Sequence, residues 1–417
     1  MSERARLERR INELAQIGRT DDPAREIYGS AVTRLGLSGE EQRARDLVAS
    51  WCAPLRAMIR RDAAANLFVR VPGARDAPVL LVGSHLDSVP MGGRFDGALG
   101  VCCAVEALTS LVEAGQRFAR PVELVAWADE EGARFGLGLF GSAAAFGRLR
   151  ADAESVRDKD GISIADALRQ LGESGRLTAA VRDPKQIRAY LELHIEQGPR
   201  LERAGVPLAI VSDIVGIFHG RITVTGVQGH AGATAMSDRV DALVAASHLV
   251  IALERIASAV PDTVATVGEI SVRPGAKNVI PGECVFSLDI RSAKQGSIDR
   301  VVDELRDELN TLIGGRVGRA RARGTKLEVL QTVPVTPLDT GIREVLLRAT
   351  KAIGVDAPLL VSGAGHDAQN PSLAGVPTGM VFVRSTGGSH TPTELASIED
   401  AVLGTRALEL AIAELAS

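Results

Sequence analysis

The chain has 417 residues, 45% of them apolar, and because this length exceeds what one hydrophobic core usually spans, two domains are expected. The net charge is −4 and the Lys and Arg residues are scattered, which excludes the concentrated positive surface of a nucleic-acid-binding protein. The charged N-terminus lacks the apolar segment of a secretory signal, no apolar run reaches the ~18 residues of a membrane span, and the four cysteines show no disulfide spacing, so a cytoplasmic protein is expected.

Strands and helices are predicted to alternate in the N-terminal and C-terminal parts of the chain. The first element is an amphipathic helix, in which Leu7, Ile11 and Leu14 share one face. Short apolar runs bounded by turn residues then predict buried strands, and the segments between them have helical periodicity. The predicted strands are Pro78–Ser84, Val122–Ala128, Ala189–Leu193, Pro358–Val361 and Gly379–Val383, and the helices between them include Gly100–Ala114, Gly161–Leu171 and Gly341–Ile353. This alternation predicts an α/β sheet.

The middle of the chain has a different pattern, in the order strand, helix, strand, strand, helix, strand. These elements are Arg221–Gly226, Asp238–Ala257, Thr263–Val272, Glu283–Arg291, Ile298–Ile313 and Lys326–Thr332. Their order is that of the ferredoxin-like split fold. We therefore predict an inserted domain at residues 213–328 and a discontinuous α/β domain formed by residues 1–212 and 329–417.

Histidines and acidic residues follow the predicted strands of the α/β sheet. They are His85, Glu131, His194 and His390 after four different strands, with Asp96 in the Gly-rich turn after His85. In open α/β sheets, ligands bind beyond the carboxyl ends of the strands, so these side chains are expected to converge at one edge. Imidazole and carboxylate ligands suit zinc, or manganese, cobalt or nickel. Each residue alone is more often an ordinary polar side chain, but their joint placement favours a metal site.

The adjacent pair Glu130 and Glu131 predicts a division of roles. Neighbouring side chains on a strand point to opposite sides, so one carboxylate can bind a metal while the other reaches a coordinated water. Metal coordination lowers the pKa of water toward about 7, and a nearby carboxylate can take the proton and deliver it to a leaving nitrogen. Asp87, two residues after His85, is placed to orient that imidazole.

Seven motifs, in chain order, resemble those of the N-carbamoyl-L-amino acid hydrolases. They are GSHLDSVPMGGRFDGALGV, DEEGARFG, HIEQGPRLE, GHAGATAM, NVIPGECVFSLDIR, SGAGHDA and GGSHTPTE. Relatives of that family include allantoate amidohydrolase, ureidoglycolate amidohydrolase and β-ureidopropionase, and the wider group includes aminoacylases and metal-dependent carboxypeptidases. The resemblance implies a metallopeptidase-like α/β catalytic domain with an inserted ferredoxin-like α+β domain, which acts as a lid and as the surface of a homodimer.

The resemblance also implies two divalent metal ions in each subunit. His85 and His194 would hold one ion, Glu131 and His390 would hold the other, and Asp96 would bridge them. Aminoacylase and carboxypeptidase relatives tend to have a carboxylate where this chain has His194. The imidazole therefore points to the carbamoylase branch.

Roles toward the substrate follow from the same resemblance. Glu130 would be the general base and acid, and His230, contributed by the partner subunit, would stabilise the tetrahedral oxyanion. Asn278 and Arg291 would bind the substrate carboxylate, since the planar fork of arginine can pair with a carboxylate through two hydrogen bonds. Gln197, beside His194, would bind the ureido group.

Three further residues are candidate substrate contacts. The resemblance implies that Gly365 and His366 line the site, and His219 lies near the hinge into the inserted domain. Two segments depart from the relatives. These are GGSHTPTE, where many relatives have Ile or Tyr before Ser, and the stretch Gly216–His219, where relatives have Gln after the glycine. Both segments are expected near the substrate, so the departures leave its identity open.

Structural alternatives exist for several of these residues. Arg291 could form an ordinary ion pair at a strand end, and Asn278 could shape the turn before Val-Ile-Pro. His366 could be a hydrogen-bond hub, and Gln197 could only support its loop. The sequence nevertheless predicts hydrolysis of a linear amide C–N bond in an N-carbamoyl-L-amino acid or related ureido acid. Alternatives are an allantoate or ureidoglycolate amidohydrolase, and an N-acyl amino acid deacylase or dipeptidase.

Overall fold

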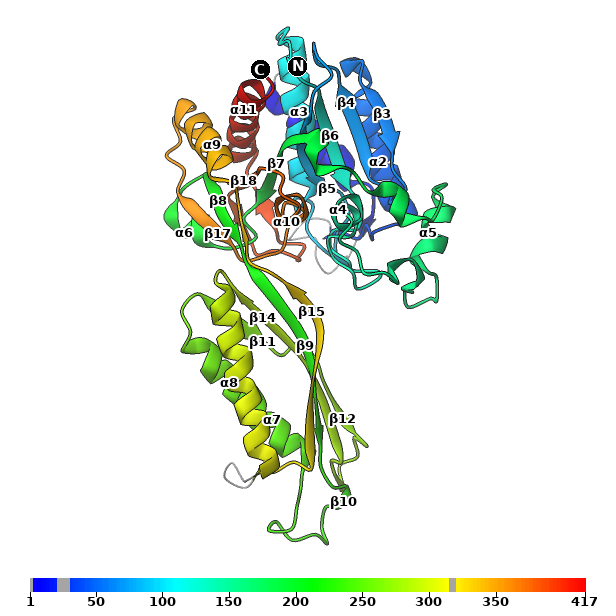
Figure 1. The fold of residues 1–417 in the computed structure, drawn as a ribbon, viewed down its shortest axis with the longest axis vertical. Helices are drawn as coiled ribbons and strands as arrows, with labels where there is room; N and C mark the ends of the chain where they lie inside the picture. Colours follow the sequence, from blue (N-terminus) through cyan, green and yellow to red (C-terminus); the bar gives the residue numbers. More distant parts are fainter. Residues whose placement is uncertain (1–2, 21–30, 315–319) are drawn as a thin grey trace. The chain divides into compact units, whose positions relative to one another are not determined.

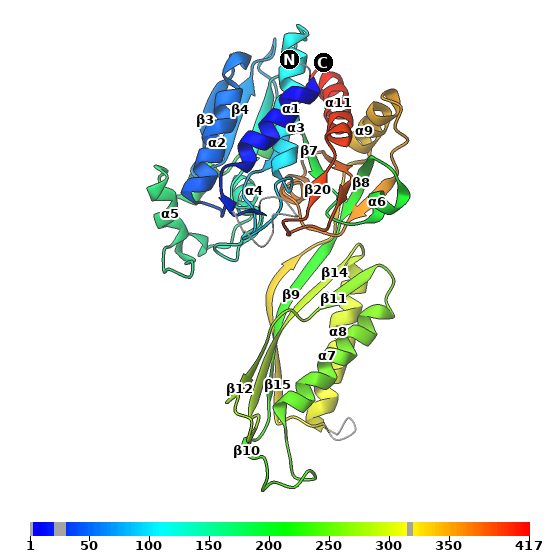
Figure 2. The same cartoon turned by 180° about the vertical axis from the view of Figure 1, so that it is seen from behind.

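The computed structural model describes residues 3–20, 31–314 and 320–417, and Figures 1 and 2 show its ribbon from two sides. Its contacts divide the chain into two compact units, Met1–Ser212 with Pro337–Ser417, and Asp213–Thr336. The second unit ends only after strand β15 (Gly324–Val333), because β15 pairs with β9 (Gly216–Thr225) along its length. None of the described helices has the length and apolar character needed to cross a membrane.

The larger unit is built on a nine-stranded sheet with the strand order β16-β8-β18-β7-β5-β6-β4-β3, and β17 pairs with β8 outside this path. Its strands are β3 (Met58–Arg61), β4 (Leu67–Val71), β5 (Val79–His85), β6 (Val122–Trp127), β7 (Ile187–Ile195), β8 (Leu208–Ile214), β16 (Thr336–Pro337), β17 (Leu359–Ser362) and β18 (Thr378–Val383). The central strands β18, β7, β5 and β6 run parallel, whereas β3, β4 and β8 pair antiparallel. The predicted α/β sheet is therefore confirmed, with antiparallel strands added outside its parallel centre.

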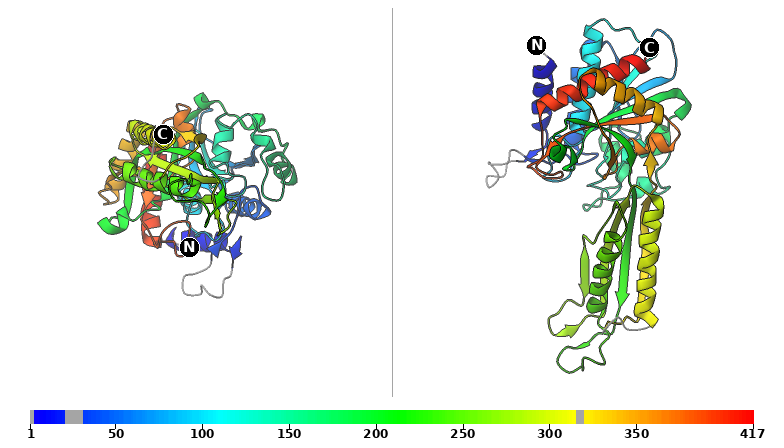
Figure 3. Two further views of the ribbon diagram at one scale, coloured as in Figure 1. Left: turned by 90° about the horizontal axis from the view of Figure 1, so that it is seen from below. Right: turned by 90° about the vertical axis from the view of Figure 1, so that its left-hand side faces the viewer.

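Helices cover this sheet and form its main core. They are α1 (Glu3–Ala15), α2 (Gly39–Trp51), α3 (Ala98–Glu113), α9 (Thr340–Ala352) and α11 (Ile398–Leu415), with the shorter α4 (Phe140–Ala145), α5 (Ile164–Gln170), α6 (Arg200–Ala204) and α10 (Gln369–Leu373). The predicted face of the first helix is confirmed, since Leu7, Ile11 and Leu14 are at most 3% exposed. Burying each such side chain contributes on the order of 2 kcal/mol. Helices α1 and α11 lie side by side, joined by Arg4 and Glu399 (Figure 3).

The smaller unit has a sheet of antiparallel strands in the order β11-β14-β9-β15, with α7 and α8 along one face (Figure 1). Its further elements are β10 (Gly229–His230), α7 (Ala242–Ser258), β11 (Thr263–Thr266), β12 (Ile270–Arg273), β13 (Val279–Ile280), β14 (Glu283–Ser292) and α8 (Gln295–Gly314). This is the predicted order of elements. The single strand predicted for Thr263–Val272 is wrong, because Ser287 Oγ accepts the backbone N–H groups of Gly268 and Glu269 and splits it into β11 and β12.

One face of the smaller sheet is apolar and the other is polar. Ile222 and Val224 of β9 are fully buried in the core beneath the helices, whereas Arg221 and Thr225 point the other way and are exposed. This alternation is the period-2 pattern of a sheet that is covered on one side. The polar face holds two candidate substrate residues of this unit, His219 and Arg291.

Candidate metal centre and substrate-contact residues

The four parallel strands at the centre of the large sheet are each followed or ended by a candidate ligand. His85 is the last residue of β5, and His194 is the second-last residue of β7. Glu131 lies four residues after β6, and His390 lies in the loop after β18. Because neighbouring parallel strands end at the same edge, these side chains gather there, together with Asp96 from the turn before α3.

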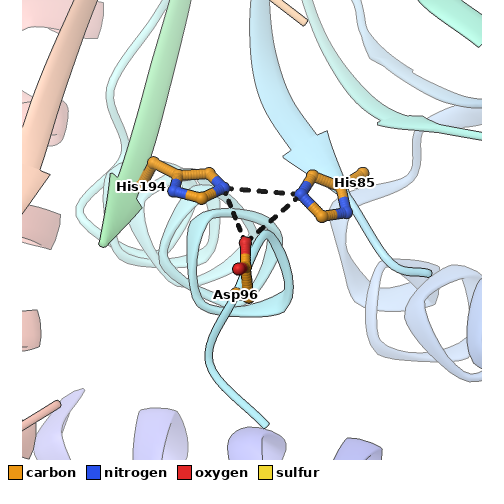
Figure 4. Close-up of side chains that lie close together, drawn as sticks. All are labelled: His85, Asp96 and His194. Atoms are coloured by element: carbon orange, nitrogen blue, oxygen red, sulfur yellow. Dashed lines mark hydrogen bonds and ion pairs between the residues drawn. The ribbon is translucent and has the colours of Figure 1, made fainter. Parts of the chain in front are cut away.

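His85, His194 and Asp96 form the first cluster, and all three are buried (Figure 4). The two Nε2 atoms of the histidines are 3.4 Å apart. Asp96 Oδ1 lies 3.6 Å from His85 Nε2 and 3.2 Å from His194 Nε2. The three donor atoms therefore point at one another, which is the arrangement that a shared cation requires.

Asp96, Glu131 and His390 form the second cluster. His390 Nε2 lies 3.5 Å from Asp96 Oδ2 and 3.2 Å from Glu131 Oε2. Asp96 thus turns one oxygen toward each cluster. The imidazole of His390 is half-exposed, whereas Glu131 is nearly buried.

The electrostatics of the two clusters fit divalent cations. Burial opposes ionisation of Asp96, but hydrogen bonds with His194 and His85 outweigh it and hold the pKa of Asp96 well below its ordinary value. Burial would lower the pKa of His85, yet the neighbouring carboxylates, Glu130 foremost, raise it well above the ordinary value. Among the described residues, Glu131 Oε1 is buried with no hydrogen-bond partner. A buried ligand oxygen therefore lacks a partner within the described residues, and the imidazole and carboxylate donors around it suit a cation such as zinc or manganese.

Glu130 stands beside this centre rather than within either cluster. Its Oε2 lies 3.6 Å from His85 Nε2, and its side chain is almost fully buried. Burial raises the pKa of Glu130 well above its ordinary value. A carboxyl group with a raised pKa can take and release a proton near neutral pH, which is the property of a general base and acid.

Asp87 fixes this corner of the centre. Its Oδ1 lies 3.3 Å from His85 Nδ1, and its two oxygens accept the backbone N–H groups of Glu130 and Glu131 at 2.9 and 3.0 Å. The strand-alternation reasoning for the two glutamates is wrong, because β6 already ends at Trp127. A loop with Asp129 in the left-handed region (φ 49°) and the Asp87 carboxylate place them instead.

Gln197 and His366 each contact a residue of the first cluster. Gln197 Nε2 donates to Asp96 Oδ2 at 2.8 Å, and Gln197 Oε1 is buried without a partner among the described residues. The ring of His366 packs 4.5 Å from that of His194, and its Nε2 lies 2.8 Å from Ser362 Oγ. Burial lowers the pKa of His366 well below its ordinary value, so this imidazole is neutral. Gly365 directly precedes it in the loop after β17.

His219 and Arg291 are joined by a residue that sequence reasoning missed, Asp289. Arg291 Nε and Nη2 donate to the two oxygens of Asp289 at 2.9 and 2.8 Å. His219 stands opposite Asp289 on the neighbouring strand, with Nε2 3.5 Å from Asp289 Oδ2, and opposite Gln331 on the other side. The i, i+2 spacing in SLDIR places Asp289 and Arg291 on one face of β14, and this spacing could have revealed the pair.

His230 and Asn278 form a second group in the smaller unit, across the short pair β10 and β13. The backbone N–H of Ala231 donates to the carbonyl of Asn278 at 3.0 Å, and both candidate side chains are exposed. His230 Nδ1 accepts the backbone N–H groups of Gly232 and Ala233 at 3.0 and 3.1 Å. Since Nδ1 is an acceptor, the proton of the neutral ring is on Nε2, which therefore serves as a donor.

Comparisons with known proteins find relatives along nearly the whole chain. The model of the family described as "Peptidase family M20/M25/M40" matches residues 81–414. An N-carbamoyl-L-amino acid amidohydrolase of Geobacillus stearothermophilus is 41% identical, over 99% of this chain and 98% of its own length. Allantoate deiminase 1 of Glycine max is 34% identical over 92% of this chain and 84% of its own. A crystal structure of an amidase of the hydantoinase/carbamoylase family from Burkholderia multivorans superimposes with a TM-score of 0.86 at 34% identity, over 99% of this chain and 98% of that one.

Proposed function

The chain belongs to peptidase family M20/M25/M40, and from this premise we propose that it hydrolyses the linear amide C–N bond of an N-carbamoyl-L-amino acid, releasing ammonia, carbon dioxide and the free amino acid. The observation that carries the substrate class is the 41% identity to an N-carbamoyl-L-amino acid amidohydrolase along nearly the whole of both chains. The allantoate deiminase that is 34% identical favours a second candidate, a ureido acid of the allantoate type.

Five residues would hold two divalent metal ions. His85, His194 and Asp96 would bind one ion, and Asp96, Glu131 and His390 the other, because these are the groups whose donor atoms converge. When bound, such ions supply Lewis acidity, which polarises an amide carbonyl and makes water more acidic. The imidazole and carboxylate donors suit zinc, manganese, cobalt or nickel.

Glu130 would move the proton of the reaction. It would take a proton from the attacking water and hand it to the departing nitrogen, since its carboxyl group is buried beside His85 and free of the two ligand clusters. Asp87 would keep Glu130 and His85 in the required positions through the contacts described above. Gln197, whose oxygen lacks a partner among the described residues, would bind an N–H of the ureido group.

Residues of the smaller unit would complete the site around the substrate. The exposed Nε2–H of His230, contributed by the partner subunit, would donate to the oxyanion. Arg291 and Asn278 would bind the substrate carboxylate. His219 would lie next to Arg291, because both side chains contact Asp289. Gly365 and His366 would line the site behind His194.

We further propose a cytoplasmic homodimer formed through the smaller unit. β15 is an edge strand of its sheet, and Val329 and Leu330 on it are 51% and 53% exposed. A groove of about 660 Å³ runs between α8 and strands β9 and β15. An unpaired strand edge with exposed apolar side chains suits pairing with a second copy. Sedimentation velocity should then show a dimer that Leu330→Lys dissociates, whereas Leu410→Lys on α11 should leave it intact.

The function is tested by a substrate panel. The metal-free protein would be reloaded separately with zinc, manganese, cobalt and nickel, and release of ammonia and free amino acid would be followed. N-carbamoyl-L-amino acids should be cleaved and N-acetyl amino acids and dipeptides should not. Cleavage of allantoate alone would select the second candidate, and cleavage of acetyl or dipeptide substrates alone would refute both.

A further inference from the structure

We propose that Glu394 is a positioning residue that ties the loop carrying Asp96 to the loop carrying His390, and that it thereby sets the affinity of the second metal site. The inference rests on the proposed function, because it assumes that the second cluster of Asp96, Glu131 and His390 holds an ion. Glu394 is 2% exposed and belongs to neither cluster. It lies 298 residues along the chain from Asp96.

The first end of this link is the backbone before Asp96. Glu394 Oε1 accepts the N–H groups of Phe95 at 3.1 Å and of Asp96 at 3.0 Å. Gly93 permits this close approach, because a Cβ there would lie 2.2 Å from Glu394 Oε1. Hydrogen bonds from backbone N–H groups to a buried carboxylate are among the stronger ones in proteins, so they fix the segment from which Asp96 projects.

The second end of the link is Ser389, the neighbour of His390. Ser389 Oγ lies 3.0 Å from Glu394 Oε2 and 3.0 Å from Asp96 Oδ2. The same hydroxyl therefore touches both the positioning carboxylate and the oxygen of Asp96 that faces His390. Glu394, Ser389 and Asp96 form a continuous chain of contacts between the two loops.

His390 depends on such support more than the other histidines do. It is half-exposed and has a left-handed backbone (φ 56°), a strained conformation outside glycine that persists only where the surroundings enforce it. Its loop closes on itself, as Thr393 Oγ1 donates to the carbonyl of Gly387. His85 and His194, by contrast, are on strands inside the sheet and are 1% exposed. Loss of Glu394 should therefore weaken the second site more than the first, whose two histidines are held by the sheet.

The substitutions separate hydrogen bonding from charge. Glu394→Ala removes the link, whereas Glu394→Gln keeps the acceptor for the two N–H groups and offers an N–H to Ser389 Oγ. Ser389→Ala removes only the half of the link next to His390. Glu106→Ala is the matched control, because Glu106 is a fully buried carboxylate that belongs to neither cluster and whose ion pairs are with Arg6 and Arg10 of α1.

The measurement is titration of the full-length metal-free protein with Zn²⁺ by calorimetry, with the stoichiometry read by native mass spectrometry. In Glu394→Ala the second ion should bind about 10- to 100-fold more weakly, as is typical when a residue supporting a metal ligand is lost, and the first ion should bind within about threefold of wild type. Ser389→Ala should weaken the second ion less, and Glu394→Gln and Glu106→Ala should leave its affinity near that of wild type.

Three results would overturn the proposal. These are equal weakening of both ions in Glu394→Ala, no weakening at all, or a Glu394→Gln variant as impaired as the alanine variant. If Glu394→Ala fails to fold, Ser389→Ala decides, because an unchanged second ion there refutes the link. A wild-type chain that binds one ion only would instead refute the two-ion centre itself, so the two failures are distinguishable.

Discussion

Asp289 should hold Arg291 ready for the substrate carboxylate, and the substitution Asp289→Asn tests this. Arg291 donates to Asp289 from Nε and Nη2. These two nitrogens form one of the two edges of a guanidinium group that can pair with a carboxylate. The pair is about one-third exposed, so its own contribution to folding is small. Its effect should therefore be on binding rather than on stability.

The magnitude follows from the entropy of ordering one side chain. Without Asp289, Arg291 must be immobilised when the substrate binds, which costs about 0.5–1.5 kcal/mol. Since about 1.4 kcal/mol corresponds to a factor of ten, KM for a carboxylate substrate should rise about 2- to 12-fold while kcat stays near wild type. A neutral substrate in which an amide replaces the carboxylate should show no such rise.

The assay is steady-state kinetics on a carboxylate substrate and its amide analogue. Asp303→Asn is the control, because Asp303 pairs with Arg306 on α8 of the same unit at 2.9 Å. A KM that falls in Asp289→Asn would refute the reasoning, since it would mean that Asp289 competes with the substrate for Arg291.

Three further predictions concern single residues of the candidate site. Glu130→Gln should retain metal, measured by elemental analysis, and lose about 10²- to 10⁴-fold in kcat, and near wild-type turnover would remove Glu130 from the proton transfer. His230→Ala should lower kcat about 10²- to 10³-fold at unchanged metal content, and an effect on KM alone would exclude the oxyanion role. The hydrogen bond with Glu131 raises the pKa of His390 to about 9 in the metal-free fold. Protonated His390 therefore stabilises that fold. This stabilisation is fully present below pH 6.5, the ordinary pKa of histidine, and is lost as the pH rises through 9. Thermal melting of the metal-free protein should show this loss of stability, and the loss should be absent in His390→Gln. Metal binding near pH 7 should also release protons, which calorimetry in buffers of different ionisation enthalpy would detect.

Residues that act within a short stretch of chain could be predicted from the sequence. The strands ending near His85 and His194 are apolar runs buried inside a parallel sheet. Such a run can be predicted as a strand without knowing which strands pair with it. Helix α2 was missed although it carries a local signal. Ser38 accepts from the N–H of Glu41 three residues later, which is the first half of a capping box, and Glu41 accepts from the N–H of Leu37, the residue before the N-cap.

Contacts between distant loops could not be predicted in this way. Glu394 meets the N–H of Phe95 across 299 residues, and the position of a lone glutamate in a loop has no periodicity that would reveal its partner. The exposed edge strand β3 was missed for a related reason, because all its residues are exposed and it lacks the alternation that marks a half-buried strand. Strand alternation could not place Glu130 and Glu131 either, because they lie in a loop after β6 whose N–H groups donate to Asp87.

The two halves of the centre are held with different rigidity, and this predicts the order in which metal is lost. His85 and His194 project from adjacent parallel strands that are buried on both faces, so they are in place before any ion arrives. Glu131 and His390 project from loops, and His390 must keep a left-handed backbone at the protein surface. Ligands that must be ordered on binding give a weaker site than ligands already in place. A chelator should therefore remove one ion per subunit first, activity should fall with that ion, and adding one equivalent back should restore it. Loss of both ions in a single step, or activity that survives removal of the first, would contradict this order.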